Sequence, residues 1–197
     1  MSMAPMNPFM GEVAQTNVTG LNCLWLQKVD YQISPIAPNN TTVLANTALT
    51  ASVQTLATGI TNPDVARNTV VKGAIATSTG NVVVTGTDIG GNAITETIAL
   101  SGTTVVAGNK AFAAVMQIVL PVTSGAGDGV SVGIGSKLGL PYTFTKNMLS
   151  KAYNNNVLES TTPTMSTPDP VNLCNNTITL ASTLAGNLLD ILLDVPG

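Results

Sequence analysis

The residue types that most often do chemistry in enzymes are scarce in this sequence, and one of them is missing. The 197 residues include no histidine. Serine–histidine–aspartate and cysteine–histidine nucleophiles both need an imidazole as their base, so the composition excludes them, together with most zinc sites. We find no other catalytic constellation, and the sequence therefore predicts a protein that is not an enzyme and uses no cofactor.

The acidic side chains are the remaining candidates for metal binding or acid–base work. Asp88, Asp128, Asp190 and Asp194 have the hard oxygen ligands that calcium prefers, but they lack the spacing of a calcium-binding loop. Asp128 stands between two glycines, which is typical of a turn, so we expect turn aspartates and no metal site. Glycoside cleavage by Glu96 with an aspartate is disfavoured, because one Trp and three Tyr offer few rings for a sugar to stack on.

Arg67 and Glu96 are lone charges in apolar surroundings. Glu96 falls on the same face of its predicted strand as Ile94 and Ile98, and an unpaired carboxylate buried there is strongly destabilising. Adjacent strands would bring Arg67 alongside, so we expect an ion pair between the two side chains. The alternative is that Glu96 lies on an exposed edge strand and guards it against pairing with another chain.

The two cysteines, Cys23 and Cys174, lie far apart in the sequence. They could form a disulfide only if the fold brought them together, and the sequence does not show that. Because the chain has no secretory context, we expect two buried, reduced thiols.

Charged residues make up only 9% of the sequence, and its net charge is −3. The resulting surface of hydroxyls and amides suits contact with other proteins. No basic patch is present, so nucleic acid is not an expected partner. No apolar run reaches the roughly 20 residues of a membrane span, and Met1 is not followed by the pattern of a secretory signal. We therefore expect a chain made in the cytoplasm with no membrane partner.

Residues 68–120 predict consecutive antiparallel strands, because β-branched runs recur there at roughly ten-residue spacing between Gly, Asn, Asp or Ser. Residues 82–85 are apolar or β-branched on both faces, which suits a strand covered on both sides. Residues 112–120 alternate so that Met116 shares a face with Phe112 and Ile118. A helix over 111–119 is the alternative, and the β-branched residues favour the strand.

The rest of the chain completes an all-β fold, an antiparallel β-sandwich with an extended N-terminal arm. Residues 1–40 are predicted to be the arm and a connecting segment, and residues 41–197 the sandwich domain. Residues 143–170, rich in Asn, Thr and Pro, predict a polar loop excursion from one end of the sandwich.

Residues 176–180 and 188–195 predict a closing hairpin. In its last strand four apolar residues alternate with outward aspartates, and they are Leu189, Ile191, Leu193 and Val195. A helix over 182–193 remains the alternative.

The first residues form an uncharged stretch that carries Met3, Met6, Phe9 and Met10 among prolines. Proline disfavours a helix there and favours extended chain. We expect residues 1–15 to anchor the protein by laying these apolar side chains in a groove of a neighbouring subunit. The alternative is an arm that folds back on its own domain.

Several short pieces of the sequence occur in an order that resembles a known family. They are Arg67-Asn68-Thr69-Val70, Val84-Thr85-Gly86-Thr87-Asp88, Gly91-Asn92-Ala93-Ile94-Thr95-Glu96-Thr97-Ile98, Lys110-Ala111-Phe112 and Lys137-Leu138-Gly139-Leu140-Pro141. This succession, over residues 64–141, resembles a family of tailed-bacteriophage virion proteins. The resemblance implies a small capsid-associated or decoration protein built as a β-sandwich. We expect the capsid surface as its location and the major capsid protein as its partner.

Two functions from different classes follow. The first is a structural protein that decorates or cements a phage capsid through protein–protein contacts alone. The second is a receptor- or carbohydrate-binding β-sandwich module of a fibre or adhesin. Few surface charges and many β-branched residues also predict a homo-oligomer, with a trimer favoured by capsid symmetry and a dimer second.

Overall fold

The structure is a computed structural model that describes residues 26–196. Within that range the chain forms β-strands, one short 3₁₀ helix and no α-helix. In chain order these elements are β1 (Leu26–Ile33), β2 (Asn39–Ala48), β3 (Gln54–Leu56), β4 (Arg67–Gly73), β5 (Asn81–Thr87), β6 (Ala93–Ala99), β7 (Val106–Phe112), β8 (Ala114–Leu120), β9 (Gly129–Gly139), β10 (Leu149–Asn154), β11 (Val157–Leu158), β12 (Thr164–Met165), η1 (Leu173–Asn175), β13 (Thr177–Thr179) and β14 (Leu189–Pro196).

One sheet, here called the meander sheet, has the strand order β3-β8-β5-β6. Its β5–β6 hairpin closes through a turn built on Asp88, whose Oδ1 accepts the backbone N–H groups of Gly90 and Asn92, each at 2.9 Å. Gly91 in this turn has a φ of +81°, a conformation that glycine adopts without steric cost. The expected turn aspartate at position 88 is thus confirmed.

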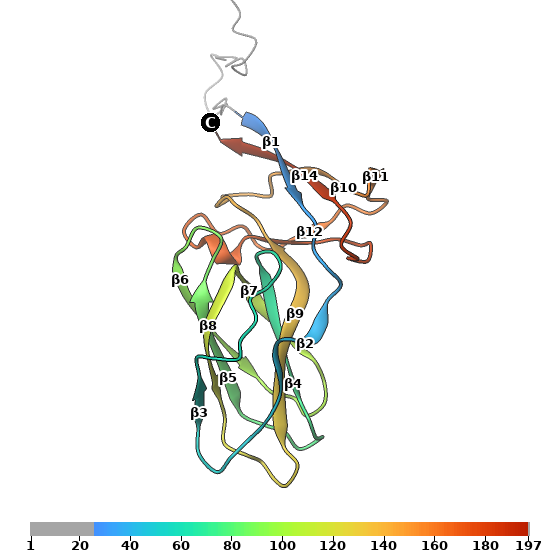
Figure 1. Ribbon diagram of the computed structural model, residues 1–197. Coiled ribbons are helices and arrows are strands. Elements are labelled where there is room, and N and C mark those ends of the chain that lie inside the picture. Colours follow the sequence, from blue (N-terminus) through green and yellow to red (C-terminus); the bar gives the residue numbers. More distant parts are fainter. Residues whose placement is uncertain (1–25, 197) are drawn as a thin grey trace, which may run out of the picture.

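A second sheet, the long sheet, has the order β12-β13-β9-β4-β7, and β2 also pairs with β9. β9 pairs with β4 along one edge and with β2 and then β13 along the other, always antiparallel. Because β9 has partners on both edges along its length, it carries the long sheet from one end of the molecule to the other (Figure 1).

The meander sheet and the long sheet pack face to face over the first hydrophobic core. Val84 on β5, Ile118 on β8 and Val132 on β9 are fully buried in it. Val83, on the opposite face of β5, is only half-buried, so the expectation that residues 82–85 are covered on both sides is wrong. Among residues 26–196, no further sheet lies over the outer face of β5.

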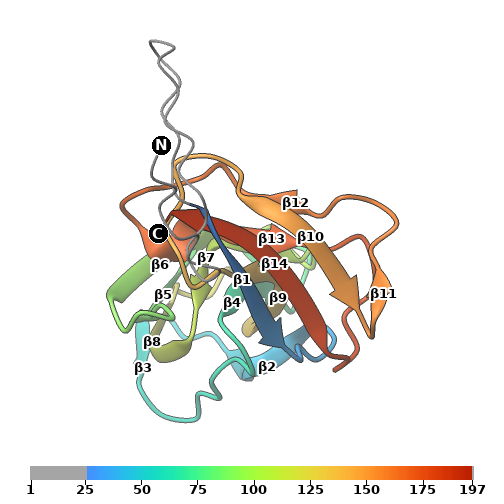
Figure 2. The ribbon, with the colours of Figure 1, turned by 90° about the horizontal axis from the view of Figure 1, so that it is seen from above.

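The third sheet, the terminal sheet, has the order β1-β14-β10-β11. β1 and β14 pair antiparallel over their whole length, from Leu26 opposite Pro196 to Ile33 opposite Leu189. The first and last described strands therefore lie side by side, at one end of the molecule in Figure 1 and in front of the sandwich strands in Figure 2, which is seen from above.

The inner face of the terminal sheet covers a second hydrophobic core. Ile191 and Leu193 of β14 are fully buried there against Leu138 of β9 and Ile178 of β13. The predicted inward face of the last strand is confirmed, and so is the choice of strand over helix. The all-β, antiparallel sandwich class predicted from the sequence is confirmed as well.

The prediction that Met116 shares a strand face with Phe112 and Ile118 is wrong. Phe112 and Ile118 are buried, whereas Met116 is exposed. The β5–β8 pairing shifts register between Thr85 and Gly86, so one residue of β8 has no partner on β5. Such a β-bulge inserts an extra residue and changes which face the following side chains occupy.

The long-range layout of the C-terminal third also differs from the prediction. Residues 143–170 were expected to be a loop, but they contain β10, β11 and β12. β13 and β14 form where a closing hairpin was expected, yet β13 pairs with β9 and β12, whereas β14 pairs with β1 and β10. Residues 26–33, assigned to the arm and connector, form β1.

Candidate functional site

The predicted ion pair between Arg67 and Glu96 is wrong. Arg67 is fully buried and pairs instead with Asp64, with Nη1 3.0 Å from Oδ1. Its Nε donates to the carbonyl of Gly135 at 2.7 Å and its Nη1 to the carbonyl of Ile36 at 3.0 Å. β4 and β6 belong to different sheets, which places the two side chains in separate networks.

Burial lowers the pKa of the Arg67 guanidinium, while its hydrogen bond to Asp64 and the charge of that carboxylate act in the opposite direction. Asp64 also accepts the backbone N–H of Ile36 at 2.7 Å. Arg67 and Asp64 together therefore attach the segment between β1 and β2 to the long sheet. This network is structural, because its charges are already satisfied within the chain.

Asn68, next to Arg67, fills an irregularity in the long sheet. The register of β4 shifts near Asn68 against both β7 and β9. The Asn68 side chain donates to the carbonyl of Gly108 at 3.0 Å and accepts the N–H of Lys137 at 2.9 Å. A Cβ at Gly135 would lie 2.3 Å from its amide oxygen, so glycine leaves the space that the side chain needs.

Glu96 lies on the Ile94/Ile98 face of β6, as predicted, but its partner is backbone. Its carboxylate accepts the N–H of Asn109 at 2.6 Å and that of Lys110 at 3.3 Å. β6 is an edge of the meander sheet and β7 an edge of the long sheet. Glu96 thus bridges the two sheets at one side of the sandwich.

Asp128 is buried and holds a turn together. It accepts hydrogen bonds from the Ser78 hydroxyl and from the backbone N–H groups of Ser124 and Gly129, the last two at 2.8 Å. Burial alone would raise the pKa of this carboxyl, but the hydrogen bonds outweigh burial and lower it. The turn role expected for Asp128 is confirmed.

The other two candidate calcium ligands lie on β14. Asp190 accepts a hydrogen bond from Gln32 at 2.7 Å, and Asp194 pairs with Lys28 at 3.5 Å. In the range 26–196 no three His, Cys, Asp or Glu side chains gather in a way that could hold a metal ion.

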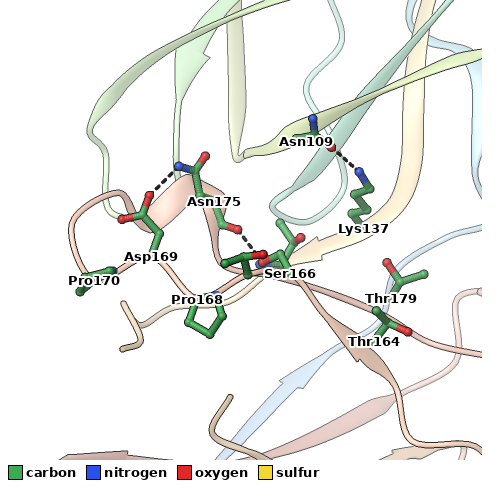
Figure 3. A pocket seen from close by; sticks show the side chains of 11 residues that line it. Asn109, Lys137, Thr164, Ser166, Pro168, Asp169, Pro170, Asn175 and Thr179 are labelled. Atoms are coloured by element: carbon green, nitrogen blue, oxygen red, sulfur yellow. Dashed lines mark hydrogen bonds between the residues drawn. The ribbon is translucent and has the colours of Figure 1, made fainter. Parts of the chain in front are cut away.

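A pocket of about 580 Å³ opens between the β7–β9 region and the segment that contains β12 and η1 (Figure 3). Side-chain hydroxyls supply much of its lining, and they come from Thr164, Ser166, Thr167, Thr177 and Thr179. Lys137 at one side donates to Asn109 Oδ1 at 2.5 Å, and Asp169 lies at the other side.

Both charged groups of this pocket are already engaged. Asp169 accepts hydrogen bonds from the backbone N–H groups of Val171 and Asn172 and from the amides of Asn172 and Asn175. These bonds, those of Asn172 foremost, hold the pKa of the Asp169 carboxyl well below its usual range. The pocket can therefore offer hydrogen bonds to a polar ligand rather than an acid–base pair.

Sequence reasoning missed this pocket, because residues 143–170 read as an irregular excursion. The local signal was the cluster of Asp169 with Asn172 and Asn175, residue types that bond to nearby backbone in turns. The partners from β7 and β9 are distant in the chain and left no such signal.

A second surface feature is the outer end of the terminal sheet at β11. Val157 and Leu158 on this edge strand are 68% and 50% exposed, and Leu188 beside the β10–β11 turn is also exposed. Asn155 and Asn156 form that turn with positive φ values of 52° and 62°. A hollow of about 410 Å³ lies next to them, lined in part by Val157 and Leu158.

Several predicted residues lie outside the described part of the chain. They are the four arm residues Met3, Met6, Phe9 and Met10, and Cys23. Cys174 is buried, as expected, and burial raises the pKa of its thiol.

Comparisons with protein-family models, curated proteins and solved structures found no match. Among the described residues, no helix is long and apolar enough to cross a membrane.

Proposed function

We propose that this chain is a structural, non-enzymatic protein of a tailed-bacteriophage virion that decorates or cements the capsid by contacting the major capsid protein. Support comes from the resemblance over residues 64–141 and from a composition with only 9% charged residues. The structural observation that carries the proposal is the β11 edge, where an open strand coincides with uncovered apolar side chains.

Edge strands offer unpaired backbone groups to a strand of another chain, and side chains beside them decide which chain fits. At β11 these side chains are Val157 and Leu158, next to a hollow that can receive an apolar side chain of a partner. Burying such side chains is the main source of affinity in protein–protein contacts.

The chain's N-terminal segment meets the described fold at the same sheet. β1 begins at Leu26, opposite Pro196 on β14, so residues 1–25 join the protein at the terminal sheet. Leu26 lies beside the C-terminal end of β14, whereas β11 lies near the Leu189 end at the opposite edge of the sheet. The predicted anchors, Met6 and Phe9 among them, would therefore supply a contact separate from the β11 edge.

Binding of the purified protein to empty capsid shells tests the proposal, with bound protein measured by co-sedimentation. The double variant V157K/L158K is expected to lose most of its binding while retaining its circular dichroism spectrum. Val171→Lys is the matched control, because Val171 is 79% exposed but lies outside the terminal sheet. Failure of the unaltered protein to bind shells, or equal binding by V157K/L158K, would contradict the proposal.

The hydroxyl-rich pocket favours a second candidate, a carbohydrate- or receptor-binding module of a fibre or adhesin. Hydroxyl and amide groups can bind sugar hydroxyls, but no aromatic ring lines this pocket for stacking. A glycan array in which binding is abolished by Asn109→Ala and Thr177→Ala would favour this candidate. An array without any signal would count against it.

A further inference from the structure

β1 is an open edge of the terminal sheet. Within residues 26–196 it pairs with β14 alone. It has eight residues, contains no proline and pairs with β14 without a bulge. Natural edge strands are usually short, bulged or interrupted by proline, because a long regular edge can pair with another chain.

The outward face of β1 carries a cation followed two residues later by an anion. Lys28 lies opposite Asp194, and its side chain is 79% exposed. Asp30 lies opposite Leu192, and its side-chain hydrogen bond in the described structure comes from Gln32 at 3.0 Å. Asp30 thus has no cation within ion-pair distance among the described residues.

We propose that β1 is a self-association surface, where β1 of a second copy pairs antiparallel about a two-fold axis at Val29. The two terminal sheets then form one continuous sheet. In this register Lys28 of each copy lies opposite Asp30 of the other. Because a two-fold interface repeats every contact, both ion pairs form together.

The charges select this register over its neighbours. An axis at Lys28 would place that lysine opposite its own copy, and an axis at Asp30 would do the same for the aspartate. Like charges directly opposite in a sheet are destabilising. A slip by one residue would set the charged face of one strand beside the apolar face of the other.

The inward face of β1 agrees with the same arrangement. Val29, Tyr31 and Ile33 pack against the second core, so joining two β1 strands continues an apolar layer across the axis. A two-fold strand pair closes at two copies, and it therefore supports the dimer rather than the trimer favoured by capsid symmetry. A single pair of edge strands is a small contact compared with the roughly 1,200 Å² of a standard interface, so a weak dimer is expected, with a dissociation constant on the order of micromolar.

Sedimentation equilibrium of the full chain tests this interface through charge reversal. Lys28→Glu and Asp30→Lys each place like charges opposite each other twice, and each is expected to weaken the dimer about tenfold or more. The double variant K28E/D30K restores opposite charges between the copies and is expected to dimerise again. It does not restore the Lys28–Asp194 pair, so recovery isolates the contact between copies.

Lys151→Glu is the matched control. Lys151 is on β10, opposite Leu192 of β14, so β14 separates it from the β1 edge. Reversing its charge is expected to leave the dimer unchanged. A chain that stays monomeric at all concentrations would overturn the proposal, and so would an oligomer indifferent to the single reversals or not rescued by the double variant. Circular dichroism of every variant establishes that it is folded.

Discussion

The carboxylate of Glu96 accepts the backbone N–H of Asn109 at 2.6 Å, and this contact joins edge strands of two different sheets. Gly108 makes it possible, since a Cβ there would lie 2.4 Å from the carboxylate. A second contact runs from β7 to β6, where the amine of Lys110 donates a hydrogen bond to the carbonyl of Thr95 at 2.8 Å. One side of the sandwich is therefore held by side-chain bonds to backbone instead of a continuous strand ladder.

Glu96→Ala is expected to lower the free energy of unfolding by about 1–3 kcal/mol, because it leaves the N–H groups of Asn109 and Lys110 without their charged acceptor. Urea denaturation followed by circular dichroism measures the change. Thr97→Ala, on the exposed face of the same strand, is the control and should change stability by less than about 0.5 kcal/mol. A Glu96→Ala protein as stable as the control would show that solvent replaces the bridge at no cost.

Arg67→Met is expected to destabilise the fold by about 3–5 kcal/mol, since it removes one partner of a buried ion pair and the donor to Gly135. Arg67→Lys should recover only part of that loss, because an ammonium group lacks the planar fork of the guanidinium. Lys28→Met removes a largely exposed partner of Asp194 and is expected to cost less than about 1 kcal/mol. Denaturant titrations measure both changes in the free energy of unfolding, and equal changes for Arg67→Met and Lys28→Met would contradict the prediction.

Features that depend on neighbouring residues in the sequence could be predicted, whereas features that depend on contacts between distant strands could not. The alternation that buries Ile94 and Ile98 is local and was predicted correctly. The partner of Glu96 was not, because it depends on a register shift that leaves residues 108–110 of β7 without paired residues on β4. The partner of Arg67 was missed although Asp64 is only three residues away, since the expectation required a charge on a neighbouring strand.

The order of the strands in the sheets could not be predicted from local sequence patterns, because it also depends on contacts between residues far apart in the chain. β1 and β14 are at opposite ends of the described chain and still pair over eight residues. Alternation identifies a strand such as 189–195 and its buried face, but not which strand lies beside it. The polar pocket depends on the same kind of long-range contact.

Asp128 is expected to make the stability of the protein depend on pH in the acid range. Its folded-state pKa lies below the ordinary value of 3.8, so the unfolded chain takes up the proton first as the pH falls. The stabilisation is therefore complete above the ordinary value and is lost as the pH falls through it toward the folded value.

Asp128→Asn provides the measurement. The difference in unfolding free energy between the natural protein and this variant should be largest near pH 7 and shrink below about pH 4. Other carboxyl groups titrate in both proteins, so they cancel in the difference. A difference that stays constant from pH 7 to about pH 3 would show that Asp128 acts by shape and not by charge.

Deletion of residues 1–15 is expected to abolish capsid binding without unfolding the protein. Both hydrophobic cores and all three sheets are formed by residues in the range 26–196, so the shortened chain retains the contacts that stabilise the described fold. Its thermal midpoint should stay within a few degrees of that of the full chain. Binding to shells should fall, because Met3, Met6, Phe9 and Met10 supply the predicted apolar anchors.

The double variant M6D/F9D separates anchoring from chain length, because it keeps every residue position and replaces two apolar side chains with charged ones. It should lose binding as the deletion does, whereas Ser2→Asp and Asn7→Asp, which alter neighbouring polar positions, should retain it. If the shortened chain coated shells as fully as the intact one, the arm would not be an anchor. Capsid attachment would then have to come from the described surface, with the β11 edge as the first place to look.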